Sequence, residues 1–252
     1  MILNHQIRGE GQPLFLIHGL FGSLENLGMV AKPLSEHFKV ISVDVRNHGS
    51  SFHKDTMTYQ EMADDILSLM SHLQIDKAIF LGHSMGGKIA MQLALSHPEK
   101  VSKLIVADIA PVSYPAHHQH IINGLQSLDF NEITTRKAAD QALSHYVENQ
   151  GVRQFLLRNI AVDKQGLSFK CNLAGIANNY AEIMKAFDPK LRYDGPTLFI
   201  KGGDSDYITA QHREIIVQHF PNSKAKIIAS TGHWLHAEKP IAFNKIVKDF
   251  IA

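Results

Sequence analysis

The feature that most constrains this chain is a series of short, almost wholly apolar runs separated by longer amphipathic segments. The runs are rich in β-branched and aromatic residues and lack the apolar–polar alternation of a half-exposed strand. Such runs are typical of strands covered on both faces, as in a parallel sheet. Six are present: Leu14–Ile17, Val40–Val43, Ala78–Leu81, Leu104–Ala107, Thr197–Ile200 and Lys226–Ala229.

Helical patterns fall between these runs. Thr58–Glu61 has the form of a capping box and predicts a helix that continues to about Leu73. A second helix is expected from Met85 to Ser96, because the following His97 precedes a proline, which disfavours helical backbone at that residue. Strand and helix in regular order predict an α/β fold with right-handed crossovers and a mostly parallel, doubly wound sheet.

One long stretch departs from this order. Between Asp108 and Gly195 we expect no strand, and helical periodicity is seen at Gln141–Tyr146, Val152–Ile160 and Leu173–Phe187. The stretch is too long for a loop, so we predict a helical cap at residues 111–190, inserted before the penultimate strand. Residues 1–110 and 191–252 would form the core of one compact domain. A packing subdomain without a role in the chemistry is the alternative to a lid.

Composition excludes several classes of function. The 252 residues are 44% hydrophobic and 19% charged, with a net charge of +1, which gives no reason to expect nucleic acid or a membrane surface as partner. The sequence has no basic segment followed by a long apolar run, so we predict neither a signal peptide nor a membrane span. The single Cys171 cannot form an internal disulfide. We expect a cytoplasmic protein, either a monomer or a small homo-oligomer.

The strongest chemical signal is the sequence Gly82-His-Ser84-Met-Gly86, directly after an apolar run and before a helix. A Gly-x-Ser-x-Gly pattern in this context predicts a nucleophile elbow, a tight turn that presents the serine hydroxyl above the sheet. Ser84 is therefore the candidate nucleophile. The N–H of Met85, at the start of the helix, is a candidate oxyanion donor. A glycine-rich turn without catalysis is the alternative interpretation.

Two further turns complete the candidate site. The sequence His18–Gly22 follows a strand, and the N–H of Leu20 is the expected second oxyanion donor. His18 itself is expected to orient this turn by hydrogen bonding rather than to act as a base. His233 follows the last strand, where it can reach the serine as the general base. Nearby His236 is expected in packing or at the surface.

These motifs resemble the α/β-hydrolase superfamily along the whole chain and, more narrowly, the bacterial YbfF-type esterases. The resemblance implies hydrolysis of carboxylic esters or thioesters, acyl-CoA among them, through an acyl-enzyme and without metal or organic cofactor. A carbon–carbon bond hydrolase or lyase-like relative is the alternative, and a non-catalytic binding relative is less favoured. The superfamily motifs are His18–Gly22, Asp44–Ser50, Gly82–Gly87 and Gly232–His233; the esterase motifs are Gly19–Gly28, Asp108–Val112 and Gly232–Pro240.

The acid that orients His233 is the open point of the site. Most α/β-hydrolases place it after the penultimate strand, which here offers Asp206 and, as a weaker candidate, Asp204. The YbfF-type esterases place it one strand earlier, where this chain has Asp108, and keep a supporting serine that matches Ser205. We favour Asp108.

A cluster of histidines at His117, His118 and His120 invites interpretation as a metal site. No Asp, Glu or Cys lies at a supporting spacing, so we expect a solvent-facing stretch of the insertion and no metal.

Overall fold

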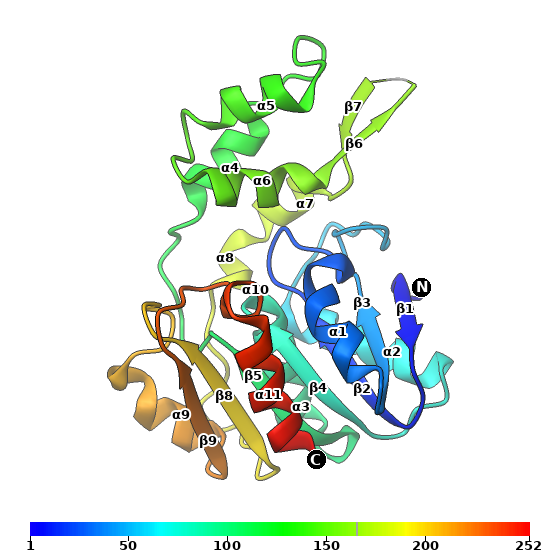
Figure 1. The fold of residues 1–252 in the computed structure, drawn as a ribbon, viewed down its shortest axis with the longest axis vertical. Helices are drawn as coiled ribbons and strands as arrows, with labels where there is room; N and C mark the ends of the chain where they lie inside the picture. Colours follow the sequence, from blue (N-terminus) through cyan, green and yellow to red (C-terminus); the bar gives the residue numbers. More distant parts are fainter. Residues whose placement is uncertain (165) are drawn as a thin grey trace.

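A seven-stranded sheet forms the centre of the computed structural model, which describes residues 1–164 and 166–252 (Figure 1). β1 pairs with β3 in the antiparallel sense, and the other neighbouring strands are parallel. The mostly parallel sheet predicted from the apolar runs is confirmed. In spatial order the strands are β1 (His5–Arg8), β3 (Phe38–Val43), β2 (Gln12–Ile17), β4 (Ala78–His83), β5 (Val101–Ala107), β8 (Thr197–Gly202) and β9 (Ser223–Ile228).

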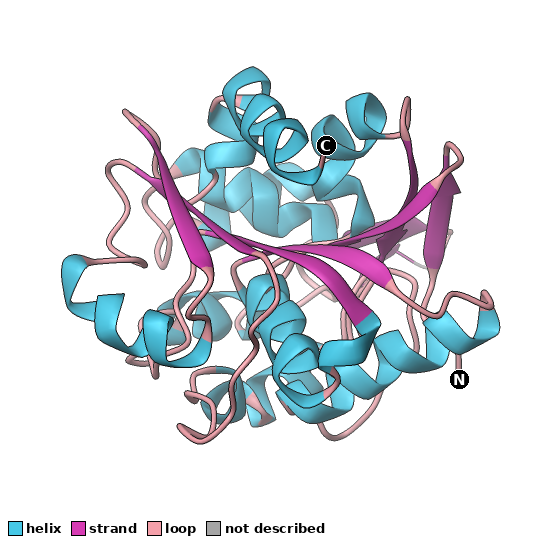
Figure 2. Ribbon diagram, turned by 90° about the horizontal axis from the view of Figure 1, so that it is seen from below, coloured by secondary structure: helices cyan, strands magenta, loops and turns pink. Residues whose placement is uncertain are grey.

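Helices cover both faces of the sheet (Figure 2). Along β2, Leu14 and Leu16 face the helices α1 and α11, whereas Phe15 and Ile17 face α2 and α3. Because neighbouring residues of a strand point to opposite faces, both sets must be apolar, which explains the unbroken runs. The covering elements are α1 (Gly28–Leu34), α2 (Tyr59–His72), α3 (Met85–Ser96), α9 (Arg213–His219), α10 (Leu235–Glu238) and α11 (Pro240–Ile251), with short 3₁₀ turns at Leu24–Leu27, Pro98–Lys100 and Ala210–His212.

Local sequence signals set the helix ends as expected. The Thr58 hydroxyl accepts the Glu61 N–H at 3.2 Å, and the Glu61 carboxylate accepts the Thr58 N–H at 2.9 Å. The predicted capping box is therefore confirmed, and α3 has the predicted bounds.

The insertion between β5 and β8 lies above the ends of the strands (Figure 1). It contains α4 (Gln119–Gln126), α5 (Arg136–Leu143), α6 (Gln150–Leu156), a 3₁₀ turn (Leu157–Asn159), α7 (Leu173–Asn178) and α8 (Tyr180–Ile183). A helical insertion before the penultimate strand is confirmed. No helix among the described residues is long and apolar enough to cross a membrane.

Two details of the insertion were predicted wrongly. It contains an antiparallel hairpin, β6 (Ile160–Asp163) and β7 (Gly166–Phe169), where no strand was expected. These four-residue strands are largely exposed and partly polar, so they lack the apolar signal of a covered strand. The helix expected at Gln141–Tyr146 lies earlier in the chain, since α5 ends at Leu143.

Candidate active site

The turn between β4 and α3 is strained and closely packed. Ser84 has φ 54° and ψ −122°, a conformation that a residue with a side chain rarely adopts. A Cβ on Gly82 would lie 2.0 Å from the Gly86 carbonyl oxygen, and one on Gly86 would lie 2.2 Å from the Ile17 carbonyl oxygen. The two glycines are therefore needed for the elbow that exposes the Ser84 hydroxyl at the end of β4.

Three side chains from separate parts of the chain meet at this elbow. His233, in the loop after β9, lies with its Nε2 2.9 Å from Ser84 Oγ. The Nδ1 of the same ring is 2.8 Å from the Asp108 carboxylate. Ser84 thus contacts His233, which in turn contacts Asp108. This is the arrangement of a nucleophile, a base and a group that orients the base.

Asp108 follows β5 directly and its side chain is fully buried. One carboxylate oxygen accepts the Gly202 N–H at 2.9 Å, and the other accepts the Ser205 hydroxyl as well as the His233 N–H. A buried carboxylate needs several donors to offset its loss of hydration, and here the backbone and Ser205 provide them beside His233.

The alternative acids lie elsewhere. Asp204 and Asp206 are both exposed on the loop after β8. Within the described part of the chain, no hydrogen bond joins either carboxylate to His233. In the structure Asp108 is hydrogen-bonded to His233, and Ser205 is hydrogen-bonded to Asp108. Asp204 and Asp206 take no part in these contacts.

The turn after β2 is held by two buried histidines. The Val45 N–H donates to His18 Nε2 at 3.1 Å, so the Nδ1 of His18 carries the proton that it shares with the Gly19 carbonyl. His48 accepts the Phe21 N–H at 3.1 Å in the same way. Burial lowers the pKa of His18 and lowers that of His48 to about 3. His18 thus orients the turn as expected, in the neutral form.

The two expected oxyanion donors are the N–H groups of Leu20, in the turn after β2, and of Met85, directly after the Ser84 turn. Met85 is the first residue of α3, where an N–H has no acceptor within the helix. Leu20 lies in the turn braced by His18 and His48. Leu20, Ser84 and Met85 line the same small cavity, so both backbone segments border the space beside the serine hydroxyl.

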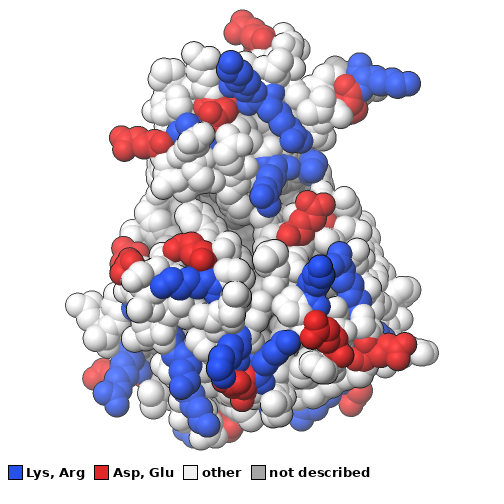
Figure 3. All heavy atoms as spheres, viewed as in Figure 1, with Lys and Arg blue, Asp and Glu red and all other residues white. Residues whose placement is uncertain are grey.

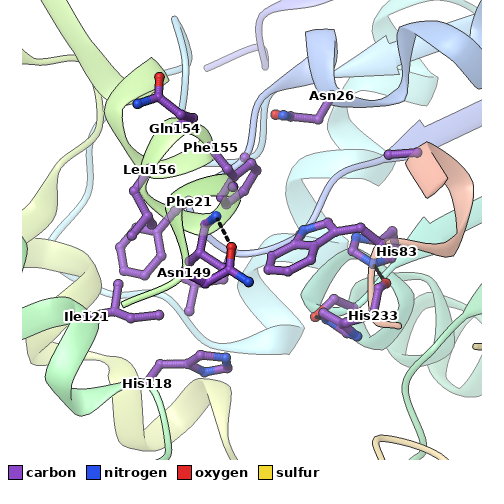
Figure 4. A pocket seen from close by; sticks show the side chains of 18 of the residues that line it. Phe21, Asn26, His83, His118, Ile121, Asn149, Gln154, Phe155, Leu156 and His233 are labelled. Atoms are coloured by element: carbon purple, nitrogen blue, oxygen red, sulfur yellow. Dashed lines mark hydrogen bonds between the residues drawn. The ribbon is translucent and has the colours of Figure 1, made fainter. Parts of the chain in front are cut away.

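A larger cavity of about 900 Å³ opens above Ser84, between the sheet and the insertion. Figure 3 shows a hollow between the two parts of the molecule. His233 lies on one side of the cavity, and Ile121, Phe155 and Leu156 of the insertion lie on the other (Figure 4). Phe21 and Trp234 also line it. The lining is predominantly apolar, which suits a substrate with a hydrophobic arm.

Sequence reasoning missed Tyr207, whose ring stacks on the His233 imidazole with centroids 3.8 Å apart. Its hydroxyl lies 3.0 Å from His117 Nε2 and 3.0 Å from His118 Nε2. A lone tyrosine in a loop of glycine, serine and aspartate carries no local pattern, and only its position beside His233 reveals it.

The histidine stretch is only partly solvent-facing, which corrects the expectation for His118. This side chain borders the large cavity, and burial lowers its pKa to about 3. Among the residues that the structure describes, no group of three or more His, Cys, Asp or Glu side chains is arranged to hold a metal ion. His236 packs between the rings of His83 and Phe243, with burial lowering its pKa to about 4.

Comparison with known proteins shows the family of this chain. The sequence profile described as the alpha/beta hydrolase fold matches residues 12–143. A Haemophilus influenzae protein described as an esterase/lipase is 41% identical over 99% of this chain and 88% of its own length. The esterase YbfF of Escherichia coli is 37% identical over 98% of this chain and 95% of its own. A solved structure described as a marine microorganism esterase is 40% identical and superposes with a TM-score of 0.96 over 99% of both chains. This chain belongs to the alpha/beta hydrolase fold family.

Proposed function

We propose that this protein is a serine hydrolase that cleaves carboxylic ester bonds, with Ser84 as nucleophile, His233 as general base and Asp108 as the acid that orients it. The observation that carries the proposal is the unbroken contact from Ser84 through His233 to Asp108 at the foot of an apolar cavity. The esterase names of two similar proteins support the same bond.

The reaction would proceed in two halves. The Ser84 hydroxyl attacks the ester carbonyl carbon while His233 Nε2 takes its proton, and the resulting oxyanion accepts hydrogen bonds from the N–H groups of Leu20 and Met85. His233 then gives the proton to the departing alcohol. A water molecule, deprotonated by the same nitrogen, attacks the acyl-enzyme carbonyl. His233 then returns that proton to Ser84 Oγ as the Oγ–acyl bond breaks and the carboxylic acid leaves. The buried Asp108 keeps its negative charge throughout and stabilises the imidazolium.

Thioesters, including acyl-CoA, fall within the same proposal. A thiol is a better leaving group than an alcohol, and the attack on its carbonyl needs the same nucleophile, base and oxyanion donors. The cavity of about 900 Å³ opens toward the insertion and leaves room for a large leaving group. We assign the insertion the role of a lid, because Ile121, Val152 and Phe155 supply its wall over the serine.

A fluorophosphonate probe tests the nucleophile, since it phosphonylates an activated serine. The wild type should be labelled and Ser84→Ala should not, with ester turnover reduced by several orders of magnitude. Ser96→Ala, at the far end of α3, is the matched control and should be labelled like the wild type. Labelling of Ser84→Ala at the wild-type rate would overturn the proposal.

A further inference from the structure

The orientation of the His233 imidazole decides whether its Nε2 reaches the serine. Asp108 accepts the Nδ1 N–H at 2.8 Å, and Ser84 Oγ lies 2.9 Å from Nε2. A hydrogen bond at Nδ1 alone lets the ring tilt, since hydrogen bonds tolerate a range of angles. Tilting moves Nε2 away from the serine, and a misplacement of about 1 Å can slow a reaction by about 10²-fold. The face of the ring therefore needs a contact of its own.

Tyr207 supplies that contact. Its ring lies nearly parallel to the imidazole of His233, with centroids 3.8 Å apart and planes inclined by 17°. The backbone of His233 is held separately, because the His83 Nε2–H donates to its carbonyl at 2.8 Å. Asp108 thus fixes one edge of the imidazole, and Tyr207 fixes its plane.

The backbone of Tyr207 is itself tied to the site. Its N–H donates to Ser205 Oγ at 3.3 Å, and the Ser205 hydroxyl donates to the Asp108 carboxylate. Its carbonyl accepts the Tyr114 hydroxyl at 2.6 Å. The residue at the face of His233 and the residue at its edge are therefore joined through Ser205, so their positions depend on each other.

The Tyr207 hydroxyl has a partner on each of two histidines. It lies 3.0 Å from His117 Nε2 and 3.0 Å from His118 Nε2. A tyrosine hydroxyl has one proton, so it donates to one neutral imidazole and accepts an N–H from the other. Burial raises the pKa of Tyr207, which keeps that proton in place near neutral pH. These contacts anchor the far end of the ring and oppose its sliding across His233.

The stack also favours the charged form of His233. In the reaction His233 becomes an imidazolium when it takes the Ser84 proton. The face of an aromatic ring carries partial negative charge and attracts a cation that lies over it within about 6 Å. The contact with Tyr207 is therefore stronger after proton transfer than before. An interaction that strengthens toward the transition state lowers the barrier.

We propose that Tyr207 is a positioning residue for the general base, which holds the plane of the His233 imidazole and stabilises its charged form by stacking. The inference rests on the proposed function and adds a residue to its machinery. Tyr207 also lines both cavities beside Ser84, so a role as a plain wall for the substrate is the alternative that the experiment must separate.

Two substitutions separate positioning from a wall. Tyr207→Leu removes the ring, and kcat for a p-nitrophenyl ester should fall by about tenfold, the loss expected for a contact of this kind. KM should stay within about twofold of wild type, because His233 acts in both halves of the reaction and both slow together. Tyr207→Phe keeps the ring and should restore kcat to within about threefold of wild type.

Three results in these variants would overturn the proposal. The first is a wild-type kcat in Tyr207→Leu. The second is a loss confined to KM, which is the mark of a wall. The third is a kcat in Tyr207→Phe as low as that in Tyr207→Leu, since the hydroxyl rather than the stacked ring would then carry the effect.

Tyr193→Leu is the matched control, because it removes a buried tyrosine ring far from the reaction. The Tyr193 hydroxyl donates to the Val101 carbonyl at 3.1 Å, at the end of β5 away from Asp108. In the folded variant, verified by circular dichroism, kcat should equal that of wild type even where stability falls. A loss of kcat as large as in Tyr207→Leu would assign the effect to a loosened fold and overturn the proposal.

The rate of fluorophosphonate labelling is a second readout. Ser84 attacks the phosphorus with the help of the same base, so Tyr207→Leu should be labelled about tenfold more slowly than wild type, yet to completion. A wild-type protein that hydrolyses no ester and takes no label would overturn the proposed function, and this inference with it. An active, labelled wild type beside a Tyr207→Leu variant that is labelled equally fast would overturn the inference alone.

Discussion

Asp108 combines two costly features that the surrounding chain offsets. Its φ of 53° lies in the left-handed region, which aspartate tolerates better than most residues, and its N–H donates to the Ile200 carbonyl at 2.8 Å. Its carboxylate is buried and accepts three hydrogen bonds. Such a residue is fixed in place before any substrate arrives, which suits a group that must hold an imidazole in one orientation.

Asp108→Asn should lower kcat for a short-chain ester by about 10⁴-fold, because an amide favours the wrong tautomer of the histidine. Asp206→Asn, a change at an exposed residue of the neighbouring loop, is the matched control and should stay within a few-fold of wild type. Steady-state kinetics on both variants, with circular dichroism to verify folding, make the comparison. Equal losses in the two variants would contradict the assignment.

The sequence could place Ser84 and His233 because each lies in a local pattern of glycines beside a strand end. It could not decide between Asp108 and Asp206 from the residues alone, since both follow predicted strands at the same edge of the sheet. What separates them is the hydrogen bond to His233, a contact between residues 125 positions apart. Tyr207 and Lys88 act through contacts of the same long-range kind, which explains why sequence reasoning did not find them.

At the scale of elements, α3 anchors the insertion. Lys88 donates to the carbonyls of Val112, just after β5, and Lys185, just after α8. One buried side chain therefore ties both connections of the insertion to α3, whose first residue, Met85, follows Ser84.

Lys88→Met should lower the free energy of unfolding by about 1–3 kcal/mol or more, because two carbonyls lose their donor in a poorly hydrated place. Lys103→Met is the matched control. Lys103 also donates to backbone carbonyls, those of Phe250, Ile251 and Ala252, but its side chain is only half-buried, so water can replace the donor. Urea unfolding of both variants measures the difference, and a loss in Lys103→Met as large as in Lys88→Met would count against the anchor.

Most of the strands that were predicted well have buried apolar runs. Five of the six runs fall on the covered strands β2, β3, β4, β5 and β8. The sixth overlaps β9, which is largely exposed. The strands that were missed, β1, β6 and β7, lie at an edge or in the insertion and are largely exposed. Their pairing depends on partners elsewhere in the chain rather than on a pattern within four residues.

At the scale of the whole molecule, several histidines are buried in the interior, where burial lowers their pKa. Burial lowers the pKa of His18 and His83, and it brings that of His48 to about 3 and that of His236 to about 4. In the unfolded chain each would titrate near its ordinary value of about 6.5. Below that pH the unfolded state binds more protons than the folded state, so acid favours unfolding.

The free energy of unfolding should therefore fall as the pH drops from about 6.5 toward 4. Each fully buried histidine contributes about 1 kcal/mol per pH unit in that window. Urea titrations between pH 8 and 5 measure the slope. It should become shallower in His236→Phe and remain unchanged in His72→Asn, since His72 is exposed. A wild-type stability that is constant from pH 7.5 to 5 would contradict the expectation.

The insertion leaves the sheet after β5 and returns at β8, and these two strands are hydrogen-bonded neighbours. Its two connections therefore begin about one strand spacing apart, near 4.8 Å, whatever lies between them. Ser84, Asp108 and His233 all lie outside residues 111–190. Recombination that exchanges this stretch, in nature or in the laboratory, can thus supply a new wall to the large cavity and leave the contact from Ser84 through His233 to Asp108 unaltered. Substrate choice and bond chemistry can diverge independently within one gene.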